Sequence, residues 1–123
     1  MRGTDLEAMT KAYLQAYDQR DLSECMGFFA EDAIIRFAMG VYKGKQAIEE
    51  WHKDRFGADL RMIRVEGTRI QGDKVIVDAI ATSKTAKAWG FDSVAGTATF
   101  VFQGGKIKQV KFGLRMSIPL EGW

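Results

Sequence analysis

The sequence of 123 residues contains one cysteine, one proline and one histidine. A single cysteine, Cys25, excludes an internal disulfide and any metal site built from several cysteines, and we expect no bound metal. The proline, Pro119, lies near the end of the chain, so no proline-rich linker divides the sequence. Acid or base chemistry that uses an imidazole would have to use His52.

Long hydrophobic runs and a strong excess of one charge are also missing. No apolar run approaches the roughly 18 residues of a membrane helix, and Asp5 and Glu7 stand where a signal peptide needs an apolar stretch. We therefore expect a cytoplasmic protein without a membrane partner. Eighteen Lys and Arg residues against sixteen Asp and Glu residues give a net charge of +2. This balance does not favour a nucleic-acid partner.

The composition that is present is typical of a globular protein with one domain over residues 1–123. Hydrophobic residues make up 46% of the chain and charged residues 28%, which excludes a disordered or fibrous protein. A chain of this length buries roughly two-thirds of its unfolded surface, enough for an internal core.

The first half of the chain is predicted to be helical. Residues 4–7 and 21–24 both have the spacing of a capping box, which marks the start of a helix. A brief strand over 33–38 is expected to come before a third helix that follows Gly44. Gly57 is expected to end this helix in the left-handed conformation that glycine tolerates.

From residue 60 onward apolar and polar residues alternate, which is typical of half-buried strands. Gly72 and Asp73 separate two extended runs, and Gly104 and Gly105 separate two more, which cover 60–71, 74–85, 94–103 and 106–118. The double glycine favours a tight hairpin turn. Helices followed by long paired strands predict an α+β domain.

Three segments carry a family resemblance, in matching order and spacing. They are residues 16–33 (AYDQRDLSECMGFFAEDA), 42–56 (YKGKQAIEEWHKDRF) and 100–116 (FVFQGGKIKQVKFGLRM). The first resembles two helices that lead into a strand, the second a glycine-led third helix, and the third a closing hairpin of the nuclear transport factor 2-like superfamily. That superfamily includes polyketide-cyclase-like proteins, ketosteroid isomerases, epoxide hydrolases, dehydratases and non-catalytic domains.

The resemblance implies a cone-shaped roll. Three N-terminal helices would pack in a strongly curved antiparallel sheet, with a pocket that opens at the wide end. The resemblance also implies a homodimer formed through the outer face of the sheet. Because one fold supports many functions, the functional residues have to be compared one by one.

At two of the three positions that correspond to catalytic residues of ketosteroid isomerase, this sequence lacks the residue type that the enzyme needs. Tyr13 falls on the position of the tyrosine that stabilises the oxyanion in that enzyme. Phe37 falls where the carboxylate base would stand, and Ala98 falls near the position of the protonated acid. The Asp-Arg-Asp pattern of epoxide hydrolases is not found either. The resemblance therefore does not predict isomerisation by that mechanism.

The inward faces of the predicted strands favour a cavity. Small residues on strand 74–85 would stand opposite large aromatic residues, which leaves volume unfilled unless the helices supply bulk. Within this cavity Tyr13 is the candidate hydrogen-bond donor and His52 the candidate acid or base. The alternatives are that Tyr13 belongs to the core, as aromatic residues on a helix stripe often do, and that His52 is a partly exposed helix residue or a hydrogen-bonded edge residue. Arg55 would bind an anionic group or extend its charge to solvent. The expected ligand-binding residues are Phe37, Trp51, Arg55, Ser83, Phe100, Phe102, Val110, Phe112 and Leu114.

Two hypotheses about function follow, from different classes. In the first, the cavity accepts an apolar small molecule with one or two oxygen functions, and any chemistry is proton transfer without a cofactor, such as isomerisation, cyclisation, dehydration or hydrolysis. In the second, favoured by the missing carboxylates, the chain is a non-catalytic dimeric module for ligand binding or protein interaction.

Overall fold

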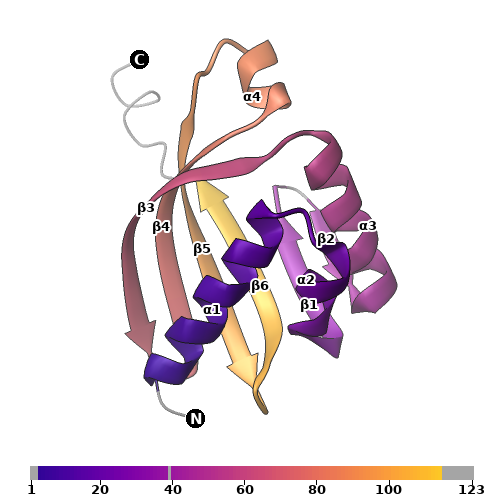
Figure 1. Cartoon of the computed structure of the whole chain (residues 1–123), viewed down its shortest axis with the longest axis vertical. Helices are drawn as coiled ribbons and strands as arrows, with labels where there is room; N and C mark the ends of the chain where they lie inside the picture. Colours follow the sequence, from indigo (N-terminus) through magenta and orange to yellow (C-terminus); the bar gives the residue numbers. More distant parts are fainter. Residues whose placement is uncertain (1–2, 39, 115–123) are drawn as a thin grey trace.

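The computed structural model describes residues 3–38 and 40–114, which form a sheet with the first three helices packed on one face and a short fourth helix beyond the ends of two strands (Figure 1). In chain order the elements are α1 (Gly3–Asp18), α2 (Leu22–Gly27), β1 (Phe29–Phe37), β2 (Gly40–Lys43), α3 (Gly44–Gly57), β3 (Arg61–Gln71), β4 (Lys74–Thr82), α4 (Lys84–Ala88), β5 (Val94–Gln103) and β6 (Lys106–Leu114). The predicted α+β class is confirmed.

The strands form a six-stranded sheet in the order β2-β1-β6-β5-β4-β3. Neighbouring strands are antiparallel except β1 and β6, which run parallel and lie side by side in the sheet. Parallel neighbours need a long crossover connection, and here all the elements from β2 to β5 lie between them. The sheet is therefore mixed, whereas the resemblance implied antiparallel strands throughout.

The core lies between the sheet and the helices. Helix α1 crosses the inner face of the sheet, and α3 lies beside β1 (Figure 1). On β4 the predicted alternation is confirmed, since Val75, Val77 and Ala79 are buried while Ile76 and the other intervening residues are not. Strands that bury one face in this way hold the helices by burial of apolar surface.

Two of the predicted local signals are confirmed in detail. The side chain of Asp21 caps α2 and accepts a hydrogen bond from the backbone N–H of Glu24 at 3.1 Å. Gly104 and Gly105 both have positive φ angles, of 60° and 79°, as the tight turn between β5 and β6 requires. The side chain of Thr4 and the strand residues predicted beyond 114 lie outside the described part of the chain.

Two sequence predictions were wrong in part at element ends. Helix α3 ends at Gly57, as predicted, but Gly57 is not left-handed; Asp59 instead has a φ of 53°, a conformation that aspartate tolerates better than most residues. The strand expected over 74–85 ends at Thr82 because Ser83 caps helix α4, where its side chain accepts from the backbone N–H of Ala86 at 3.0 Å. The short strand β2 was not predicted.

Gly44 allows α3 to start directly after β2, because its φ is 86°. An added Cβ would meet only the backbone oxygen of Glu31, at 4.0 Å. We therefore expect Gly44→Ala to lower the free energy of unfolding by about 1 kcal/mol through backbone strain alone. Urea unfolding measures this cost. Gly27→Ala is the control, since Gly27 has open space and no positive φ; equal stability of the two variants would contradict the prediction.

None of the helices in the described ranges is both long enough and apolar enough to cross a membrane.

Candidate functional site

A cavity of about 1130 Å³ opens between helices α1, α3 and α4 and the inner face of the sheet. Protein interiors seldom leave voids larger than a water molecule, and a volume of this size is typical of a site for a small organic molecule. On β4 and β5 the wall includes four small residues, namely Ala79, Ala81, Gly96 and Ala98. The space exists there because these side chains do not fill it.

Three aromatic residues form another part of the wall. The rings of Trp51 on α3 and Phe112 on β6 are stacked, with centroids 5.4 Å apart and planes at 20°. Phe37 on β1 meets both rings edge-on, at 5.6 Å from each. Contacts of this geometry add to the stability that burial provides, and they make this part of the wall apolar.

Arg55 brings a positive charge to the same place. Its guanidinium carbon lies 4.7 Å from the ring centroid of Phe37 and 5.9 Å from that of Trp51, within the range of cation–π attraction. The Nε of Arg55 and the Nε1 of Trp51 are both buried without a hydrogen-bond partner. Among the described residues, no hydrogen bond or ion pair of the Arg55 side chain is found.

Tyr13 and His52 form a buried hydrogen-bonded pair. The Tyr13 hydroxyl lies 2.8 Å from Nε2 of His52, and Nδ1 of His52 lies 2.8 Å from the carbonyl oxygen of Ile48. A carbonyl oxygen can only accept, so Nδ1 carries the proton of a neutral imidazole. Nε2 is then an acceptor, and the Tyr13 hydroxyl donates its proton to it. The Tyr13 oxygen is left with its acceptor lone pairs.

Burial keeps both members of this pair uncharged at neutral pH. Loss of solvent lowers the pKa of His52, an effect that the hydrogen bond to Ile48 opposes. Loss of solvent also raises the pKa of Tyr13 well above its ordinary range. Tyr13 belongs to the cavity wall, whereas His52 is not among the wall residues and lies behind Tyr13.

The lowered pKa of His52 predicts a pH dependence of stability. Between the folded pKa and about 6.5, the ordinary histidine value, the unfolded chain binds a proton that the folded chain does not. The free energy of unfolding should therefore be fully retained above about pH 6.5 and fall below it, by at most about 1.4 kcal/mol per pH unit. Chemical unfolding from pH 5 to 8 measures this slope.

The matched variant for this measurement is His52→Gln, which does not titrate and should lose the slope between pH 5 and 6.5. Asp32 and Asp59 also have lowered pKa values, through contacts with Lys108 and with Arg61 respectively. Those carboxylates change the stability only below their ordinary pKa, near 4, so they do not contribute to the slope between pH 5 and 6.5. An unchanged slope in His52→Gln would show that His52 is not its source.

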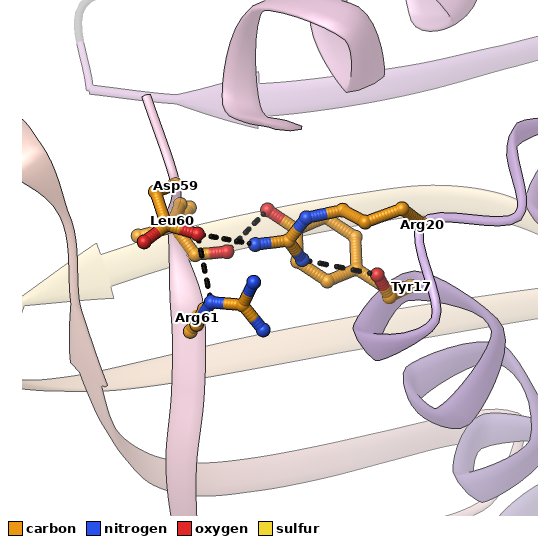
Figure 2. Close-up of polar contacts among 5 residues, drawn as sticks. All are labelled: Tyr17, Arg20, Asp59, Leu60 and Arg61. Atoms are coloured by element: carbon orange, nitrogen blue, oxygen red, sulfur yellow. Dashed lines mark hydrogen bonds and ion pairs between the residues drawn. The ribbon is translucent and has the colours of Figure 1, made fainter. Parts of the chain in front are cut away.

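A cluster of polar contacts joins the end of α1 to the start of β3 (Figure 2). Asp59 accepts from Arg20 at 2.8 Å and from Arg61 at 2.7 Å. The hydroxyl of Tyr17 donates to the carbonyl oxygen of Leu60 at 3.0 Å. We call these five residues the rim cluster; it ties the end of α1 to the start of β3, and Tyr17, Leu60 and Arg61 belong to the cavity wall.

The structure brings some of the predicted site residues to the cavity and leaves others in the core. The predicted residues on the wall are Tyr13, Phe37, Trp51, Arg55, Ser83 and Phe112. His52, Phe100, Phe102 and Val110 are buried away from the wall. The side chain of Leu114 lies outside the described part of the chain. The roles assigned to these residues stay predictions.

Sequence reasoning missed the mouth of the cavity. Trp89 is 77% exposed and Phe91 is 38% exposed, and both belong to the wall, as does Val65 on β3. The signal available was the pair of large aromatic residues around Gly90 in an otherwise polar stretch. Large apolar residues exposed together often mark a binding surface.

Two further kinds of site can be assessed in the described ranges. No group of three or more His, Cys, Asp or Glu side chains there is placed to hold a metal ion. Cys25 is fully buried, and loss of solvent raises the pKa of its thiol to about 12. A thiol with such a pKa is not a nucleophile at neutral pH.

Comparison with known proteins identifies the family of the chain. No curated protein matches the sequence. Solved structures with similar folds include a candidate polyketide cyclase from Sinorhizobium meliloti (21% identity, TM-score 0.78, 92% of this chain and 100% of that chain covered). Others are Bal32a from a soil-derived mobile gene cassette (16%, 0.81, 93% and 92%) and a candidate ketosteroid isomerase from Kribbella flavida (14%, 0.78, 94% and 81%).

These likenesses show the fold, and a family model supplies the assignment. The model described as the SnoaL-like domain matches residues 10–110, which is most of the chain. This range contains the first two segments that carried the resemblance and most of the third. The chain belongs to the SnoaL-like domain family of the nuclear transport factor 2-like superfamily.

Proposed function

We propose that this chain binds an apolar small molecule in the cavity, and that the Tyr13–His52 pair can move a proton to or from it. The observation that carries the proposal is the volume of about 1130 Å³ with a wall made mostly of apolar side chains. Unfilled apolar volume destabilises a folded protein. A bound apolar molecule would remove that cost.

The orientation of the Tyr13–His52 pair sets the chemistry that we propose. Because the Tyr13 proton is directed to His52, the Tyr13 oxygen would accept a hydrogen bond from a hydroxyl group of the ligand. A proton leaving the ligand would move to the Tyr13 oxygen while the Tyr13 proton moves to Nε2 of His52. The positive charge then rests on the imidazole, which acts through Tyr13, and no cofactor takes part.

Binding without catalysis is the second candidate function for the same cavity. Asp18 is the one carboxylate among the described wall residues, and it is exposed. A buried carboxylate base of the kind used by ketosteroid isomerase is therefore missing from the described wall. This observation favours a module that binds an apolar molecule and leaves it unchanged.

Titration with a neutral fluorescent probe, N-phenyl-1-naphthylamine, tests the binding proposal that both candidates share. The probe should bind saturably with one site per chain, and its fluorescence should rise because the cavity excludes water. A linear rise without saturation would show only weak partition onto exposed apolar residues such as Trp89, and would contradict the proposal.

Pairing of two copies through the outer face of the sheet is a further part of the proposal. Ile76 and Ile80 on β4 and Val101 on β5 are only partly buried and alternate with residues that are buried against the helices. A second copy would cover these side chains. Sedimentation equilibrium measures the mass in solution, and a monomer at all concentrations would contradict the pairing.

A further inference from the structure

We infer that Arg55 and Trp51 form a site for the carboxylate group of the cavity's ligand. This inference rests on the proposed function and adds the chemical class of the molecule, an apolar compound with one carboxylate. The two residues lie four positions apart on α3, so they face the same side of the helix. Both belong to the cavity wall.

The first argument is the unmet hydrogen-bonding capacity of these two side chains. Trp51 is 1% exposed and its Nε1–H has no partner, and the Nε–H of Arg55 is likewise buried and unpaired. Buried donors in native proteins are nearly always paired, so each exception calls for an explanation. Two adjacent exceptions on the wall of one cavity are explained by an acceptor that belongs to the ligand.

The second argument is charge. Arg55 stays protonated at every physiological pH, and no described carboxylate forms an ion pair with it. The nearby Asp59 is already shared by Arg20 and Arg61 in the rim cluster (Figure 2). A half-buried cation without a counter-ion attracts an anion, and the aromatic wall strengthens that attraction by excluding water.

The third argument concerns the kind of anion. Phe37 and Trp51 hold the guanidinium by cation–π contacts, which use no N–H group and so leave its donors for a ligand. A planar carboxylate matches the paired donors of a guanidinium, which can bind it through two parallel hydrogen bonds. Most of the remaining wall is apolar and suits a hydrocarbon body.

Competition between two ten-carbon probes tests this inference. Decanoate and 1-decanol have the same chain and differ in the headgroup, and each is used to displace N-phenyl-1-naphthylamine at pH 7.5. We expect decanoate to bind the parent protein at least about tenfold more tightly than 1-decanol, as one charged hydrogen-bonded contact provides. This comparison needs no variant.

Variants then test whether Arg55 is the source of the preference for decanoate over 1-decanol. Arg55→Gln should bring decanoate to the affinity of 1-decanol while 1-decanol binding is unchanged, and Arg55→Lys should keep part of the preference because the charge remains without the paired donors. Lys53→Gln is the control, since it removes the same charge from the exposed side of α3, where Lys53 pairs with Glu49 and Glu50. It should leave the preference unchanged.

The outcomes separate this inference from the proposed function. Equal binding of decanoate and 1-decanol, or an Arg55→Gln variant that weakens both alike, overturns the carboxylate site and leaves the apolar cavity in place. Failure of both compounds and of the fluorescent probe to bind overturns the proposed function. The indole N–H resonance of Trp51 gives a second readout: a downfield shift with decanoate and none with 1-decanol supports the site, and equal shifts contradict it.

Discussion

The double variant Ala79→Phe with Ala98→Phe is expected to weaken binding of N-phenyl-1-naphthylamine at least about tenfold, which corresponds to about 1.4 kcal/mol. Both alanines belong to the part of the wall that small residues leave open. Two phenyl rings placed there would occupy space that the probe needs. Fluorescence titration of parent and variant under identical conditions measures the loss.

The stability of the same variant is the more discriminating measurement. Added bulk in a packed core costs about 1–3 kcal/mol because neighbouring side chains must move. Here the rings enter open volume and gain contacts, so the free energy of unfolding should stay the same or rise. Ala33→Phe is the control, since Ala33 is fully buried on β1 and is not a wall residue; it should destabilise by that amount. Equal destabilisation at both places would mean that the cavity is filled in solution.

The second large effect is expected at the Tyr13–His52 pair. Tyr13→Phe and His52→Leu should each lower the free energy of unfolding by about 1–3 kcal/mol, because each leaves the other buried group without its partner. The double variant removes both polar groups, so it should cost less than the sum by about 0.5–3 kcal/mol. A double-mutant cycle from urea unfolding gives this coupling energy.

Tyr17→Phe supplies the control cycle with His52→Leu. The Tyr17 hydroxyl donates to Leu60 and not to His52, so the coupling in this cycle should be close to zero although the two rings lie 6.2 Å apart. Strict additivity in the Tyr13 cycle would contradict the hydrogen bond from which the proposed proton transfer begins.

Much of the fold could be predicted because its signals are local. The cap at Asp21, the double glycine at 104 and 105 and the alternation along β4 each depend on a few neighbouring residues. Helix α4 was not predicted, because Ser83 follows a strand on one side and caps a helix on the other. The sequence within a few residues does not show which of the two prevails.

The site was less predictable because it depends on contacts between distant residues. Tyr13 and His52 are 39 positions apart, yet they form a hydrogen bond, and of the two only Tyr13 belongs to the cavity wall. From its place on α3, Arg55 was predicted either to bind an anionic group or to be exposed. Whether its Nε has a hydrogen-bond partner depends on all the residues packed around it. Such information appears only when the chain is folded.

The parallel pairing of β1 with β6 also determines when the fold can be completed. The edge of β1 that does not face β2 finds its backbone partner in β6. The N–H and C=O groups on that edge therefore stay unpaired until all the elements from β2 to β6 have been synthesised. Pairings between such distant segments slow folding, because the chain loses the entropy of a long loop before it gains the contacts that offset this loss. A ribosome-bound chain that stops before β6 would therefore expose an open sheet edge, the feature that invites aggregation and chaperone capture.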